Sequence, residues 1–187
     1  SSVVLDGGTL RTLANRTFTT AISLGAGGGT IDTLDMTLLT GVVSGNGGLT
    51  KIGSSLLYLL GANTYLGGTT VNGGAIYIET DGALGNASGG VTLNNGGRIV
   101  VGRALASNRS LTLGSGGGTF DTGSYNLTWN GVVQGTAGLT KWGTGTLILS
   151  GTNTYTGDTA IERGSLQISS DANLGVVGRL ILTNYAT

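Results

Sequence analysis

The sequence predicts an all-β protein, a right-handed parallel β-helix with almost no α-helix, from three observations. The stretch 48–78 returns without gaps at 138–168, and about half of its positions are identical. Apolar segments of four to six residues, such as Ala75–Ile78, are bounded by Gly, Asn, Ser or Asp, which is typical of strands and turns. No window shows the apolar spacing of an amphipathic helix, and each of the 38 Gly residues would weaken a helix by about 1 kcal/mol.

The repeated stretch is part of a longer unit. Gly28–Thr33 is similar in sequence to Gly117–Thr122, and Asp81–Gly85 is similar to Asp171–Gly175. We therefore predict one β-helix over 1–187, with units at about 3–90 and 91–178 and a truncated third unit at 179–187. Self-similarity at a fixed period indicates a solenoid, propeller or array, and a propeller blade needs only about 40–50 residues.

The size of a β-helix coil sets the expected shape. Coils of roughly 20–24 residues would give each unit about four coils, and the chain roughly eight coils stacked about 4.8 Å apart. Neighbouring coils would then hold each other, as in other repeat proteins. The predicted interior consists of Leu57, Leu59, Ile76, Ile78, Leu147, Leu149, Leu166 and Ile168.

Composition excludes several classes of function. Nine basic residues balance nine acidic ones without a basic cluster, which argues against a nucleic-acid partner. The chain has no Cys and no His, so a disulfide scaffold and a zinc or copper site are not expected. No apolar run is long enough for a membrane-spanning helix. We expect no cofactor, and we interpret the chain, which lacks an initial Met, as a fragment whose targeting segment lies outside it.

Acidic and aromatic residues are the candidates for a catalytic, calcium-binding or glycan-binding site. Asp32 and Asp121 recur one unit apart, too far for the paired carboxylates of a glycosidase, and we interpret them as turn residues. Gly27–Asp32 superficially resembles a calcium-binding nonapeptide but lacks its tandem repetition. Trp129 and Trp142 are expected to be structural, with a glycan-contact face as the alternative.

Two pairs of residues recur inside the repeat itself. Lys51 and Lys141 are expected to be solvated strand residues that blunt edge pairing, with ligand contact as the alternative. Tyr65 and Tyr155 are expected to pack against a Gly-rich turn, with stacking on sugar rings as the alternative.

Written out, the repeat reads GLTK-x-G-x-x-x-L-x-L-x-G-x-NTY-x-G-x-T-x-x-x-x-G, and it resembles a known family. It is similar to the passenger-associated transport repeat, also called the autotransporter-associated β-strand repeat. The motif residues that we assign a structural role are Gly48, Leu49, Thr50, Lys51, Asn63, Thr64, Tyr65, Gly138, Leu139, Thr140, Lys141, Asn153, Thr154 and Tyr155.

The resemblance implies a segment of a type V autotransporter passenger on the outside of a bacterium. Such passengers are secreted through a C-terminal outer-membrane β-barrel of the same polypeptide, and these repeats are associated with efficient secretion and with folding outside the cell. The implied role is non-catalytic: a structural or adhesive stalk at the cell surface. Its expected partners are host-cell or matrix glycans or proteins, or other copies of itself. A polysaccharide-active β-helix enzyme and a segment of a vacuolating-type toxin passenger remain as alternatives.

Overall fold

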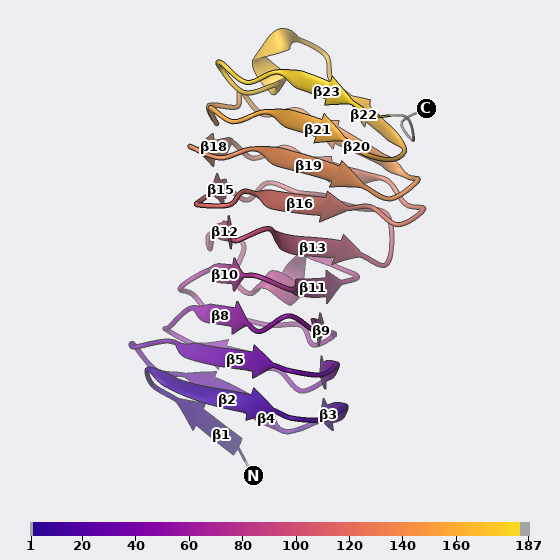
Figure 1. Ribbon diagram of the computed structural model, residues 1–187. Helices are drawn as coiled ribbons and strands as arrows, with labels where there is room; N and C mark the ends of the chain where they lie inside the picture. The colour runs from indigo at the N-terminus through magenta and orange to yellow at the C-terminus, as the bar shows by residue number, and fades with distance from the viewer. Residues whose placement is uncertain (1, 184–187) are drawn as a thin grey trace.

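The structure is a computed structural model that describes residues 2–183 as a parallel β-solenoid (Figure 1). In this part of the chain every strand pairs in parallel with the strand one turn away. One turn takes between 19 residues, from Leu56 to Ala75, and 23 residues, from Ala75 to Arg98. One sheet has nine strands, one in each turn, so the described chain makes about nine turns rather than the eight expected. The predicted fold class is therefore confirmed as a parallel β-solenoid.

The turns build three faces, which run along the length of the solenoid. The first face holds β1 (Ser2–Leu5), β4 (Ala21–Leu24) and β7 (Val43–Gly45), and after an interruption β14 (Leu105–Ser107), β17 (Leu127–Trp129), β20 (Thr146–Leu149) and β22 (Ser165–Gln167). The second face holds β2 (Gly8–Thr12), β5 (Gly29–Thr33), β8 (Leu49–Ile52), β10 (Thr69–Asn72), β12 (Val91–Asn94), β15 (Leu111–Leu113) and β18 (Val133–Gly135). The third face holds β3 (Arg16–Phe18), β6 (Thr37–Leu39), β9 (Leu56–Leu59), β11 (Ala75–Ile78), β13 (Gly97–Val101), β16 (Gly118–Asp121), β19 (Leu139–Trp142), β21 (Thr159–Ile161) and β23 (Leu180–Leu182).

The interruption of the first face is a change from strands to irregular chain. Residues 60–66 still follow the face, because the Thr64 N–H donates to the Val43 carbonyl at 2.8 Å. One turn later the Asn86 N–H donates to the Tyr65 carbonyl at 2.9 Å, after the short 3₁₀ helix η1 (Asp81–Leu84). A second 3₁₀ helix, η2 (Asp171–Asn173), occupies the same place in the second unit. The expectation of almost no α-helix is therefore confirmed for the described residues.

The core fills the inside of the solenoid from end to end. Inward residues alternate with outward ones along each strand, as the period of two requires, and the six predicted residues from Leu57 to Leu149 are fully buried. Leu166 and Ile168 are only partly buried, because they lie in the last described turn, with a neighbouring turn on one side. Trp129 is also fully buried, with its ring 4.9 Å from that of Phe120.

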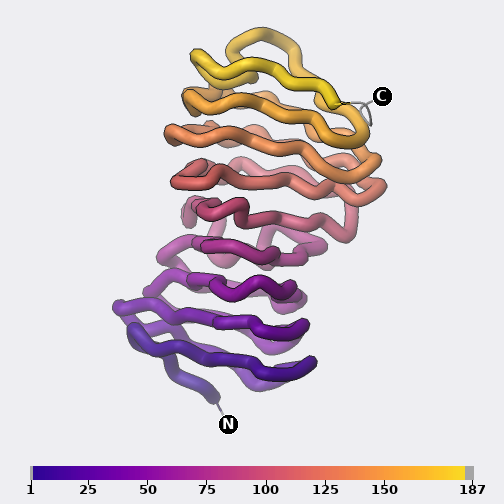
Figure 2. The backbone as a smooth tube through the Cα atoms, viewed as in Figure 1, coloured from indigo at the N-terminus to yellow at the C-terminus, as the bar shows by residue number. Residues whose placement is uncertain are grey.

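The two copies of the repeat lie on different faces of the solenoid, and the tube in Figure 2 shows the stacked turns between them. Strand β8 begins at Leu49 on the second face, whereas its counterpart β19 begins at Leu139 on the third. The two starts are 90 residues apart, and 90 residues at 19–23 per turn make about four and a third turns. Each unit is thus rotated by about a third of a turn from the one before, instead of spanning four whole coils.

Candidate functional site

The repeated residues form two structural contacts in each unit rather than one pocket. In the first unit, Gly48–Lys51 leads into β8 on the second face, and Asn63–Tyr65 lies in the strandless part of the first face. In the second unit, Gly138–Lys141 leads into β19 on the third face, and Asn153–Tyr155 continues the second face beyond β18. The chain order of the motif is therefore kept while both parts move to the next face.

The two asparagines connect three successive turns. The Asn63 Oδ1 accepts from the Val43 N–H at 2.8 Å, and its Nδ2 donates to the Ala83 carbonyl at 2.7 Å. Asn153 repeats this contact, accepting from the Val133 N–H at 2.8 Å and donating to the Asn173 carbonyl. Both side chains are buried, so each one satisfies backbone groups that no strand pairs at the place where the sheet is interrupted.

The two tyrosines lie inside the solenoid, next to these asparagines. The Tyr65 hydroxyl shares a hydrogen bond of 2.5 Å with the Thr69 hydroxyl, and Tyr155 repeats it with Thr159 at 2.6 Å. A Cβ added to Gly85 would lie 2.7 Å from the Tyr65 ring, so glycine is what lets the next turn cover the ring. The predicted packing of Tyr65 and Tyr155 against a Gly-rich turn is confirmed, and burial raises the pKa of both phenols. Because both rings are fully buried, they are out of reach of a sugar.

The expectation that the two lysines are solvated is wrong. Lys51 and Lys141 are both 0% exposed, because each stands two residues after an inward leucine and points the same way. The Lys51 Nζ donates to the carbonyls of Ile52 and Gly53, both at 2.8 Å. The Lys141 ammonium donates to the carbonyls of Trp142, Gly143 and Arg163 at 3.0, 2.7 and 3.1 Å. The ammonium groups thus satisfy, from inside, carbonyls at the corner that follows the strand.

Burial changes the acid–base behaviour of these lysines. Desolvation lowers the pKa of Lys51 and of Lys141 from 10.5 to about 8, and the nearby carboxylates of Asp32 and Asp121, respectively, act in the opposite direction. A buried ammonium is tolerated when its donors are satisfied. With no exposed surface, neither lysine can contact a ligand on the outside.

The remaining motif residues shape the backbone or face solvent. A Cβ on Gly48 or Gly138 would lie 2.8 or 2.6 Å from a carbonyl oxygen of the next turn, so the chains approach too closely there for another residue. Leu49 and Leu139 are buried in the core. Thr50 and Thr140 are half-buried on the outer surface, and Thr64 and Thr154 are exposed.

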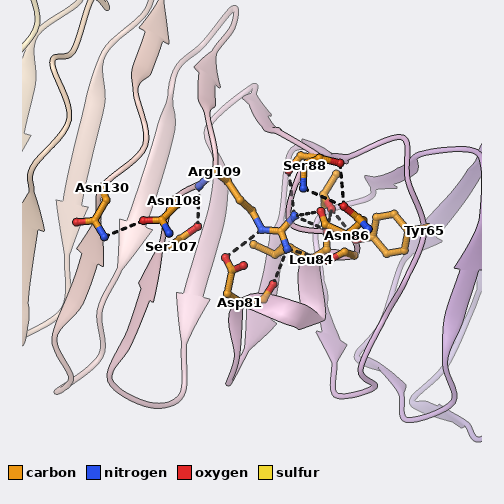
Figure 3. Close-up of polar contacts among 12 residues, drawn as sticks. Tyr65, Asp81, Leu84, Asn86, Ser88, Ser107, Asn108, Arg109 and Asn130 are labelled. Atoms are coloured by element: carbon orange, nitrogen blue, oxygen red, sulfur yellow. Dashed lines mark hydrogen bonds and ion pairs between the residues drawn. The ribbon is translucent and has the colours of Figure 1, made fainter.

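Arg109 forms the densest polar contact of the described chain, although no motif or repeat marks it in the sequence. Its buried guanidinium donates to the carboxylate and carbonyl of Asp81, both at 3.0 Å, and to the carbonyls of Leu84, Gly85, Asn86 and Gly89 (Figure 3). These oxygens all belong to the loop that interrupts the first face. Arg109 therefore closes this loop from the following turn, which starts the face again with β14.

The two recurring aspartates lie on different faces, and each is paired with an arginine. Asp32 is on the second face, 2.6 Å from Arg11, and Asp121 is on the third face, 3.4 Å from Arg98. Residues 2–183 contain no group of three or more His, Cys, Asp or Glu side chains placed to hold a metal ion. They also contain no helix with the length and apolarity needed to cross a membrane.

The structure separates the two tryptophans, which the sequence had grouped together. Trp129 lies in the core, whereas Trp142 is half-buried on the outer side of β19, with the Arg163 guanidinium 5.0 Å above its ring. The structural interpretation is therefore confirmed for Trp129, and Trp142 is left facing outwards.

The fold and the repeated contacts together define a parallel β-solenoid that contains the same motif in each of its two units. The model of the passenger-associated transport repeat family matches the chain twice, at residues 49–78 and 139–168. This match confirms the resemblance of the motif to the passenger-associated transport repeat. The two matched segments contain all six of the lysines, asparagines and tyrosines described above.

Two curated proteins are similar to parts of the chain. The adhesin BmaC autotransporter of Brucella suis biovar 1 (strain 1330) is 43% identical over 123 residues, which is 60% of this chain and 4% of that protein. An extracellular serine protease of Serratia marcescens is 52% identical over 40 residues, which is 21% of this chain and 4% of that protein. The chain thus spans a small fraction of either relative. No solved structure matches it significantly.

Proposed function

We propose that this chain is a non-catalytic segment of a secreted autotransporter passenger, which serves as a stalk and promotes secretion by folding outside the cell. The observation that carries the proposal is the way in which the turns are held. Each strand, each bridging asparagine and each capped loop contacts the turn before or after it. Such a solenoid can form progressively, one turn at a time.

Progressive folding is what outward transport requires. Without ATP outside the cell, the free energy of folding can bias the movement of a chain that emerges through the proposed C-terminal barrel. Each new turn buries inward Leu, Ile or Val residues against the previous turn, and the burial of one such side chain contributes about 1.5–3 kcal/mol. Asn63 and Asn153 connect neighbouring turns by hydrogen bonds, so segments without strands are also held to the turn before them.

The comparisons support the surface location and the adhesive context. The similar proteins are named an autotransporter adhesin and an extracellular protease, and this segment would accordingly lie outside the cell or at its surface. A stalk fits the elongated shape in Figure 1, in which β1 and β23 lie at opposite ends of the stack. Asp32 and Asp121 lie on different faces, and each is ion-paired with an arginine. This arrangement favours the stalk over a polysaccharide-cleaving enzyme, which needs two carboxylates close together.

The test compares two substitutions at neighbouring residues of β20 in the full-length parent protein. Leu147 is fully buried and Ile148, next to it, points outwards. We expect Leu147→Asp to reduce surface display of the passenger severalfold, because a carboxylate in the core stops the turn from forming. Ile148→Asp should leave display near the wild-type level. Unchanged display of Leu147→Asp, in a chain whose segment is shown to be unfolded, would contradict a folding-driven role.

A further inference from the structure

A hollow on the outer side of the third face carries side chains that the repeat does not require. It is lined by Arg98, Thr119, Thr140, Trp142 and Glu162, and has a volume of about 280 Å³. These residues come from β13, β16 and β19, and from the end of β21, which lie one above another in Figure 1. Arg98, Thr119 and Thr140 are directly in register on successive strands. Two residues further along β16 and β19, Asp121 is in register with Trp142.

The hollow is the C-terminal part of a longer groove. Arg98 also lines a hollow that reaches back to Ser54 and Leu56, whereas Thr119 and Thr140 also line a hollow on the same turns that reaches Asp158. From β9 to β21 the groove crosses five steps between neighbouring strands, which is about 24 Å at the spacing of a β-sheet. A groove of this length accommodates an extended chain rather than a single small molecule.

The chemistry of the lining matches a sugar polymer. The indole of Trp142 offers an aromatic surface on which the C–H face of a sugar ring can pack. Threonine hydroxyls donate and accept, carboxylates accept, and the Arg98 guanidinium donates, which are the partners that sugar hydroxyls need. No hydrogen bond or ion pair to the Glu162 carboxylate occurs among the described residues. The carboxylates of Asp121, Asp158 and Glu162 balance the guanidinium groups of Arg98, Arg163 and Arg179, so the groove does not select a polyanion.

The first unit supplies an internal comparison. The hollow on the second face, with a volume of about 250 Å³, is lined by Gly28, Gly48, Thr30, Thr50 and Thr70, among others, and is the counterpart of the one that reaches Asp158. Ile52 and Asn72, the counterparts of Trp142 and Glu162, do not line it. There Ile52 stands in register with Asp32 as Trp142 does with Asp121. Asn72 and Gly73 replace Glu162 and Arg163. The first unit therefore folds at this place with an Asp–Arg pair, that of Asp32 and Arg11, but without an aromatic ring and without counterparts of Glu162 and Arg163. The presence of these three side chains in the second unit calls for an explanation other than folding.

We propose that this groove binds a neutral linear glycan, with Trp142 packing against one sugar ring and with Asp121, Glu162 and Arg98 hydrogen-bonding its hydroxyls. The proposal adds a ligand to the stalk function but does not depend on it, because binding is measured on the purified chain and not through secretion.

The experiment titrates the 187-residue chain with cellohexaose, mannohexaose and laminarihexaose, and in parallel with polygalacturonate and heparin. At least one neutral hexasaccharide should bind, and Trp142→Ala should weaken that binding at least tenfold. Ile52→Ala, the matched change in the first unit, should leave the affinity unchanged, and urea unfolding should show that both variants are folded. Trp142 should also report binding by its fluorescence, since Trp129 is in the core; a Trp129→Phe variant isolates that signal.

Three outcomes would overturn the proposal. The first is the absence of binding to all three neutral oligosaccharides at millimolar concentration. The second is binding that Trp142→Ala does not weaken, which would place the ligand elsewhere. The third is binding confined to the polyanions, polygalacturonate or heparin, which would assign the groove to another class of ligand.

Discussion

Replacing Asn63 with alanine tests the contact that connects three turns. The substitution removes the acceptor of the Val43 N–H at 2.8 Å and the donor to the Ala83 carbonyl at 2.7 Å, and all three residues are buried. A buried polar group left without a partner destabilises a protein by about 1–3 kcal/mol, so two of them should lower the free energy of unfolding by about 2–6 kcal/mol. This is a large share of the stability of an ordinary domain, about 5–15 kcal/mol.

Urea unfolding followed by circular dichroism measures this loss, and hydrogen exchange of the Val43 amide locates it. Asn130→Ala is the control, because the Asn130 side chain is exposed and donates to the Asn108 side chain at 2.9 Å; its effect should stay below about 0.5 kcal/mol. The double variant with Asn153→Ala should show additive losses, since about four turns, or roughly 20 Å, separate the two sites. A loss below about 1 kcal/mol, with the Val43 amide as protected as before, would refute the reasoning.

Two further predictions concern pH and glycine. Because the pKa of Lys51 and Lys141 is about 8 in the folded chain and 10.5 when unfolded, the unfolded state binds more protons between these values, and stability should rise with pH there, by about 1.4 kcal/mol per pH unit for each lysine at most. The urea midpoint should therefore be higher at about pH 9.5 than at about pH 7.5. It should fall again above about pH 10, because tyrosines ionise in the unfolded chain before the buried ones do. A midpoint that does not depend on pH, or that Lys51→Met leaves unchanged, would count against buried ammonium groups. Gly85→Ala should destabilise the chain by about 2–4 kcal/mol, because Gly85 has φ +82° and its added Cβ would lie 2.7 Å from the Tyr65 ring. Gly82→Ala, which meets no atom within 4 Å, should have little effect in the same melting experiment, and equal effects of the two would show that the ring contact is unimportant.

Sequence periodicity was sufficient for the fold and for most of the core. The alternation in segments such as Ala75–Ile78 predicts inward Ile76 and Ile78, and both are fully buried. The same alternation also predicts that Lys51 points inwards. Lys51 stands two residues after Leu49, so the strand turns both side chains inwards. The general rarity of buried lysines outweighed that pattern, and the pattern was right because the corner carbonyls of Ile52 and Gly53 satisfy the ammonium.

Other features depend on contacts that no local pattern records. Arg109 binds a loop that lies 20–28 residues before it, and it follows an ordinary stretch of Ser and Asn residues. The rotation between units depends on the number of residues in each turn, and a mean error of one residue per turn would hide it. The separation of Trp129 from Trp142 required the strand register, which places one residue in the core and the other on the outer surface.

The advance of about one third of a turn between units has a geometric consequence for how such a molecule meets its surroundings. In a chain that continued the pattern, three consecutive units would point a given surface feature in three directions, and a fourth would return it to the first. A filament decorated in this way has no preferred side. A neighbouring cell or matrix could therefore approach it from any direction and still find one copy of the feature turned towards it.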